Sequence, residues 1–102
     1  MRTKFKVREK DYDLVLERRQ RGEGDTFQPF GVTVSGQPGG PVSGTLQLTD
    51  SLLQTADENA TSNESSAEEL VATACVRSLA SELSFRKLKP DFSFVVDHRW
   101  LG

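Results

Sequence analysis

An amphipathic helix with a well-marked start is the feature that most constrains the fold of this chain. Two overlapping pairs, Ser65 with Glu68 and Ser66 with Glu69, fit the capping box. In this motif a hydroxyl accepts a backbone N–H and the acid reaches back to the cap. The acids also lie at the positive end of the helix dipole, so both pairs favour a helix that begins here.

The same segment continues with one apolar stripe. Apolar residues recur at spacings of three and four, as on the buried face of a helix; they are Leu70, Val71, Ala74, Cys75, Leu79 and Leu83. Arg86 and Lys87 suit the negative end of the dipole, and a residue before proline leaves the helical region. We predict a helix over Ser66 to Lys87, ended by Lys89 and Pro90.

A strand is predicted directly after this helix, at Phe92 to Asp97. Phe92, Phe94 and Val96 share one face at period two, and only Val95 is apolar on the other. We expect the helix to cover the apolar face of the sheet that contains this strand.

Two alternating segments open the chain, Phe5 to Arg8 and Tyr12 to Arg19. Their apolar residues are in opposite phase, so a turn or a bulge must lie within Glu9 to Asp11. The two segments are therefore either a tight hairpin or one long bulged strand. The absence of glycine there favours the bulge.

A second pair of strands is predicted in the middle of the chain. Phe30, Val32 and Val34 alternate with small or polar residues, and the run Gly36 to Pro41 interrupts them. Alternation resumes over Thr45 to Thr49, which predicts a wide-looped hairpin.

Three loops and one short turn complete the prediction. Asp50 is expected to cap a helical turn that runs through Ala56. Flexible loops are expected near residues 22–26, 36–44 and 57–65, where glycine, proline or polar residues dominate.

These elements predict an α+β fold in a single domain over residues 1–102. A chain of 102 residues supports one hydrophobic core. Three or four strands, a helix and a final strand give a mainly antiparallel sheet of about four to five strands on one main C-terminal helix. Short links between consecutive strands exclude parallel pairing without a crossover.

Composition excludes several classes of protein. No run approaches the roughly 18 apolar residues of a membrane span, and the basic start lacks the apolar segment of a secretory signal. We therefore expect a cytoplasmic location and no membrane partner. Cys75 is the only cysteine and His98 the only histidine, so neither a disulfide, a zinc site nor another cofactor is predicted.

Catalytic residues are hard to assemble from this sequence. Cys75 lies on the apolar stripe, where burial makes a thiol unreactive. His98 would need a nucleophile and an orienting acid, and adjacent Asp97 points to the opposite face of a strand. A small enzyme using His98 is the residual hypothesis.

The C-terminal residues His98, Arg99 and Trp100 are a candidate partner-binding site. Trp and Arg dominate interface hot spots, and terminal segments are ordered where they dock on something. The alternative is that Trp100 packs back on the core of this domain. Our first hypothesis is a non-enzymatic interaction or regulatory module that forms a homo-oligomer through a sheet edge and the Trp100 region.

Charge is unevenly distributed although the net charge is only -2. Basic residues dominate both ends of the chain, and acidic residues dominate residues 22–84. If the first and last strands are neighbours, the basic residues form one patch that neutralises phosphates. The alternative hypothesis is thus a nucleic-acid-associated regulator that uses Lys4, Lys6, Arg8, Arg18, Arg19, Arg21, Arg86, Lys87 and Lys89. We favour the other interpretation of these residues, in which charged side chains protect an exposed sheet from aggregation.

Overall fold

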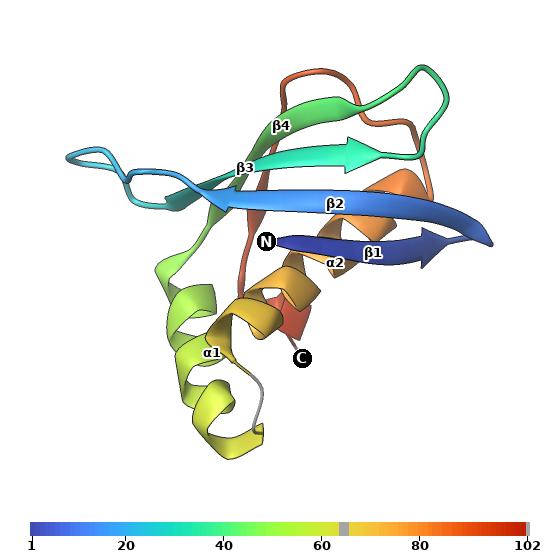
Figure 1. The fold of residues 1–102 in the computed structure, drawn as a ribbon. Coiled ribbons are helices and arrows are strands. Elements are labelled where there is room, and N and C mark those ends of the chain that lie inside the picture. The colour runs from blue at the N-terminus through green and yellow to red at the C-terminus, as the bar shows by residue number, and fades with distance from the viewer. Residues whose placement is uncertain (64–65, 102) are drawn as a thin grey trace.

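One five-stranded sheet, in the order β1-β2-β3-β4-β5, organises the chain (Figure 1). The computed structural model describes residues 1–63 and 66–101. Its strands are β1 Arg2–Val7, β2 Lys10–Arg18, β3 Gln28–Ser35, β4 Val42–Leu48 and β5 Phe92–Val96. The helices are α1 Asp50–Asn63, α2 Ala67–Leu83 and the 3-10 helix η1 His98–Leu101. The predicted α+β class and mainly antiparallel sheet are confirmed.

The first two strands form a tight hairpin, so the preference for a bulge was wrong. Val7 pairs with Lys10, and the two turn residues Arg8 and Glu9 have positive φ angles of 49° and 68°. Such a two-residue turn usually contains glycine, which is why the sequence favoured the bulge. The turn places Phe5 opposite Tyr12, with their rings stacked at 5.3 Å between centroids.

β5 pairs in parallel with β4, and this pairing requires the crossover that α1 and α2 provide. Consequently β1 and β5 lie at opposite edges of the sheet. The condition for a single basic patch, that the first and last strands are neighbours, is therefore not met. Short links alone did not reveal a crossover built from two consecutive helices.

α1 begins one residue earlier than predicted and is longer. The Thr49 hydroxyl, in place of the Asp50 side chain, accepts the N–H of Leu52 at 3.2 Å. The helix continues through residues 57–63, where a loop was predicted, while residues 64–65 lie outside the described residues. Leu52 and Ala56 are fully buried, and Leu53 packs against the core beside them, so this largely polar helix is anchored by a short apolar face.

α2 starts as predicted and ends sooner. The Ser66 hydroxyl accepts the N–H of Glu69 at 3.1 Å, whereas Ser65 lies outside the described residues. The helix stops at Leu83 instead of Lys87, because the chain turns there to bury Leu88. Pro90 therefore does not end the helix.

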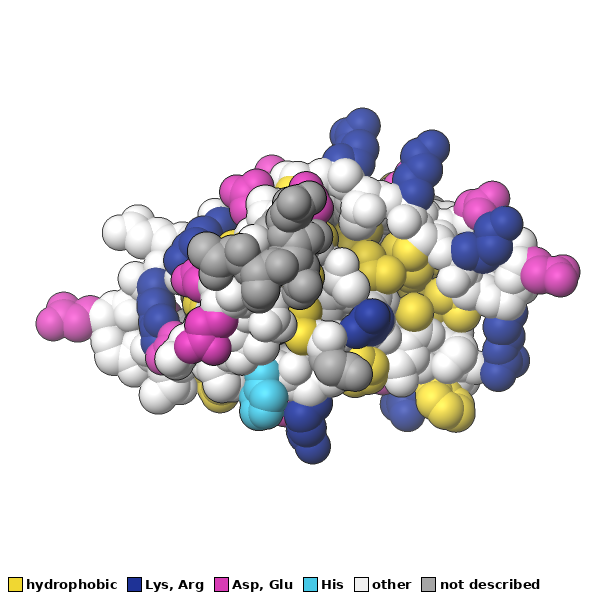
Figure 2. Space-filling model, turned by 90° about the horizontal axis from the view of Figure 1, so that it is seen from below, with side chains coloured by type: hydrophobic (Ala, Val, Ile, Leu, Met, Phe, Trp, Pro, Cys, Tyr) yellow, Lys and Arg dark blue, Asp and Glu magenta, His cyan; other side chains and the backbone are white. Residues whose placement is uncertain are grey.

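The helices pack on one face of the sheet and leave the other face open (Figure 1). The core between them contains side chains with no exposed surface, including Leu14, Val34, Leu46, Leu48, Leu52, Leu79 and Val96. Seen from below, hydrophobic side chains remain visible beside the helices, with basic residues around the rim (Figure 2). The predicted 22–26 loop lies within residues 19–27, which link β2 to β3, and the predicted 36–44 loop is shorter because β4 begins at Val42.

A substitution at Gly44 tests the parallel pairing of β4 with β5. A Cβ at this position would overlap both the carbonyl oxygen and the ring of Phe92. We expect Gly44→Ala to lower the free energy of unfolding by about 1–3 kcal/mol, because overpacking displaces β5 from β4. Urea denaturation measures the change. Ser93→Ala, at an exposed position of the same strand pair, should change it by less than about 0.5 kcal/mol.

Candidate functional site

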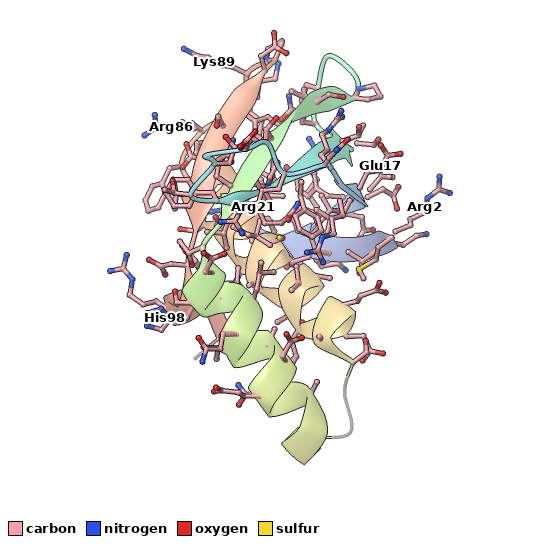
Figure 3. All side chains as sticks on the ribbon, turned by 90° about the vertical axis from the view of Figure 1, so that its left-hand side faces the viewer. Arg2, Glu17, Arg21, Arg86, Lys89 and His98 are labelled. Carbon is pink, nitrogen blue, oxygen red and sulfur yellow. The ribbon has the colours of Figure 1, made fainter. Side chains whose placement is uncertain are left out.

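The nine basic residues of the predicted nucleic-acid patch do not form one surface. β1 and β5 are the two edges of the sheet, so Arg2 and Arg86 project on opposite sides of the molecule (Figure 3). The nine residues instead fall into an edge pair, three separate arginines and one cluster. Each group has its own environment.

Lys4 and Lys6 form the edge pair, on the open face of β1. Lys6 lies 3.6 Å from Asp11, and Lys4 is directly opposite Asp13 on β2. Such cross-strand pairs stabilise a hairpin, and basic residues on an edge strand discourage pairing with another chain. This environment fits the protective role.

The three separate arginines serve different parts of the fold. Arg21 forms an ion pair with Asp50 at 2.8 Å, which lowers the pKa of that carboxyl. The Arg19 guanidinium lies directly over Gly31, where any side chain would collide with it. Arg18 lies beside a partly enclosed apolar pocket of about 340 Å³ between the sheet and the two helices.

The remaining four basic residues, Arg8, Arg86, Lys87 and Lys89, gather at one end of the sheet. Two loops, residues 36–41 and 84–91, face each other there across an open groove of about 790 Å³. Arg86, Lys87 and Lys89 line it, and Arg8 joins the first two at an adjoining hollow of about 280 Å³. We call the groove and this hollow the basic groove.

Phe85 is a functional candidate that the sequence reasoning missed. Its side chain lines both parts of the basic groove and is 80% exposed. The predicted helix ran through it to Lys87, so its position in a loop was hidden. A phenylalanine immediately before Arg86 and Lys87 was the available signal.

A buried glutamine holds the two loops of the basic groove together. Gln37 donates from Nε2 to the carbonyl of Leu88 at 3.0 Å, and its Oε1 accepts the N–H of Leu88 at 3.2 Å. Both residues are buried. The amide therefore acts like a strand partner for Leu88 and holds the two loops of the groove together.

The electrostatics of the basic groove are dominated by its cations. Arg86 is paired with Glu82 at 3.1 Å, one helical turn earlier. Lys87 and Lys89 have no ion-pair partner within residues 1–63 and 66–101, and both are exposed. The residues that line the groove include no Asp or Glu.

At the C-terminus, η1 places the predicted partner-binding residues His98, Arg99 and Trp100 in different environments. Trp100 is half-buried and packs against the core, in line with the alternative that it packs back on this domain. Its carbonyl accepts a hydrogen bond from Arg77 Nη1 at 3.0 Å. Arg99 remains 81% exposed while it holds Asp97 at 2.8 Å, which lowers the pKa of that carboxyl. His98 projects from the surface on the same side as β5 (Figure 3).

His98 does have a hydroxyl neighbour. Its Nδ1 lies 3.1 Å from Ser51 Oγ, and Ser51 Oγ lies 3.0 Å from Thr49 Oγ1. A catalytic pair also needs a group that orients the imidazole, and Asp97 is bonded to Arg99 instead. The contact ties η1 to the start of α1.

The β5 edge is a second candidate surface. All five of its residues, Phe92 to Val96, are uncharged, and none is proline. Val95 points to the open face with 54% of its surface exposed. Arg86 and Lys89 lie on this side of the molecule (Figure 3).

Residues 1–63 and 66–101 contain neither a metal-binding cluster nor a membrane-spanning helix. This part of the chain holds no cluster of three or more His, Cys, Asp or Glu side chains suited to a metal ion. None of its helices has the length and apolar character needed to cross a bilayer.

Gln37→Ala should destabilise the protein. It leaves the buried N–H and carbonyl of Leu88 without partners, so we expect the free energy of unfolding to fall by about 2 kcal/mol. Urea denaturation tests this expectation. Gln20→Ala, at an exposed position, is the matched control, and equal effects of the two changes would contradict the role of Gln37.

Cys75 predicts a pH dependence of stability. Burial raises the pKa of its thiol from 9.0 to about 12. The unfolded chain therefore loses this proton first, and stability falls as pH rises between these values, by up to about 1.4 kcal/mol per pH unit. Denaturation curves at increasing pH should show a steeper loss for the wild type than for Cys75→Ala. Equal slopes would contradict the prediction.

The β5 edge and the basic groove are thus two candidate surfaces among the described residues. The chain matches no protein-family model, no curated protein and no solved structure.

Proposed function

We propose that this protein is a non-enzymatic interaction module that self-associates by pairing its β5 edge with β5 of a second copy. The contrast between the two sheet edges carries the proposal. β1 presents Arg2, Lys4 and Lys6, whereas β5 has no charge, proline or bulge along its length. Proteins usually protect an edge strand by such devices, and an unprotected edge is a template for another strand.

The backbone of β5 has groups available for this pairing. The Val96 carbonyl accepts the N–H of Thr49, so the backbone groups of Val96 face the β4 side. Because these groups alternate along a strand, those of Ser93 and Val95 point outward. Two residues of each copy therefore offer both a donor and an acceptor to an added antiparallel strand.

Charge favours one register for this pairing. A two-fold axis through Phe94 would set Asp91 opposite Asp97 of the second copy, which places like charges together. An axis through Val95 instead brings Asp91 towards Arg99 of the second copy and sets the two Val95 side chains side by side. The same patch then serves both copies, as a two-fold interface requires.

The Trp100 region holds the residues at the end of this interface in place. Trp100 packs against the core and so holds η1 at the end of β5. Arg99, which η1 carries, holds Asp97 through Nε and Nη2 and is still 81% exposed, so its Nη1 can meet an acidic residue of the second copy. In this proposal the Trp100 indole positions η1, and the Arg99 guanidinium contacts the second copy.

Val95→Lys is expected to convert a wild-type dimer into a monomer. The substitution sets two ammonium groups beside each other at the axis, and like charges directly opposite are destabilising. Light scattering coupled to gel filtration measures the mass. Ser43→Lys, on the exposed open face but inside the sheet, should leave the dimer intact. A monomeric wild type, or a dimeric Val95→Lys, would remove the proposal.

Cross-linking tests the register. Residues paired on adjacent antiparallel strands have Cα atoms about 5.5 Å apart, within the range of a disulfide. Mild oxidation should link Val95→Cys into a covalent dimer on non-reducing gels. Ser93→Cys should not link, since position 93 then faces position 97 of the second copy. Buried Cys75 does not compete. Faster linking of Ser93→Cys would refute the Val95 axis.

A further inference from the structure

The basic groove contains cations that the proposed dimer does not use. Lys87 and Lys89 are exposed without a carboxylate partner among the described residues, and Arg86 shares only Glu82. Since three basic residues and no acid line the groove, we expect a positive potential there although the whole chain has a net charge of -2. An anionic ligand fits this site.

Phe85 gives the groove a second kind of contact. Phe85 is 80% exposed and lines the groove together with Arg86 and the loop of residues 36–41. Exposed aromatic rings beside basic side chains are the combination that binds single-stranded nucleic acid, because a base stacks on the ring while cations hold the phosphates.

The groove is also preorganised. Gln37 locks its two loops through Leu88, so binding need not order them. A Cβ on Gly39 would lie 3.5 Å from the Lys87 ammonium nitrogen, which places the opposite loop beside this cation. Pro38, Pro41 and Pro90 stiffen the walls.

We propose that the basic groove binds single-stranded nucleic acid. Phe85 stacks on one base, while Arg86, Lys87 and Lys89 contact phosphates. A duplex fits less well because its base faces are hidden within the stack. A membrane surface fits less well, because the loop offers only one exposed apolar ring for insertion. The site is a groove, and an extended chain such as a nucleic-acid strand can fill a groove. This site includes some of the nine basic residues predicted from sequence to bind nucleic acid, together with Phe85, which was not predicted.

Fluorescence anisotropy with a labelled oligothymidylate tests the proposal. Three phosphate contacts predict that affinity falls about tenfold when salt is raised threefold. Phe85→Ala should weaken binding about tenfold while the salt dependence stays the same. Lys87→Glu should weaken binding and also reduce the salt dependence. Phe85 and Lys87 are exposed, so both variants should keep the wild-type circular dichroism spectrum.

Lys4→Glu is the matched control, because it makes the same charge change on the distant β1 edge. It should alter affinity by less than about twofold. Equal losses in Lys4→Glu and Lys87→Glu would overturn the site, as would equal affinity for duplex and single strand. Failure to bind the oligonucleotide at low salt would show that the ligand is not a nucleic acid. The same conclusion would follow if Phe85→Ala weakened binding to anionic vesicles or polyglutamate but not to the oligonucleotide.

This proposal is separable from self-association. Val95 does not line the basic groove, so the Val95→Lys variant should bind the oligonucleotide like the wild type in the monomeric state. A dimer without nucleic-acid binding would overturn only the groove, and binding by a monomeric wild type would overturn only the dimer.

Discussion

The parallel pairing of β5 with β4 is the interaction on which the rest of the structure depends. It buries Phe92 against Gly44, and the Val96 carbonyl accepts the N–H of Thr49 at the residue that caps α1. Both helices must then lie on one face of the sheet, because they form the crossover between these strands. The same pairing makes β5 the open edge and directs the 84–91 loop towards residues 36–41.

Local features of the fold were predictable from sequence, and long-range ones were not. Ser66 and the alternation of the strands are encoded within a few residues, so the cap and most strands were predicted correctly. The end of α2 depends on Leu88 binding Gln37, 51 positions earlier in the chain. No local pattern reports such a contact. The length of α1 was missed for a related reason, since its stability comes from packing rather than composition.

The candidate surfaces show the same division. Exposed cations were predicted by residue type, but their grouping depends on strand order, which local alternation does not determine. Arg21 illustrates this, because its partner Asp50 lies 29 positions away. Phe85 was overlooked because it fell within the predicted helix but outside its apolar stripe. The uncharged edge needed only strand order to be recognised.

The two proposals meet at the start of β5. In the proposed dimer, antiparallel pairing brings η1 of one copy beside the Lys89 end of the groove of the other. Arg99 of the second copy would then approach Lys89 as well as Asp91. The stacking and phosphate contacts proposed for the groove nevertheless all come from residues of one copy, so a monomeric variant keeps them and the two proposals can fail separately.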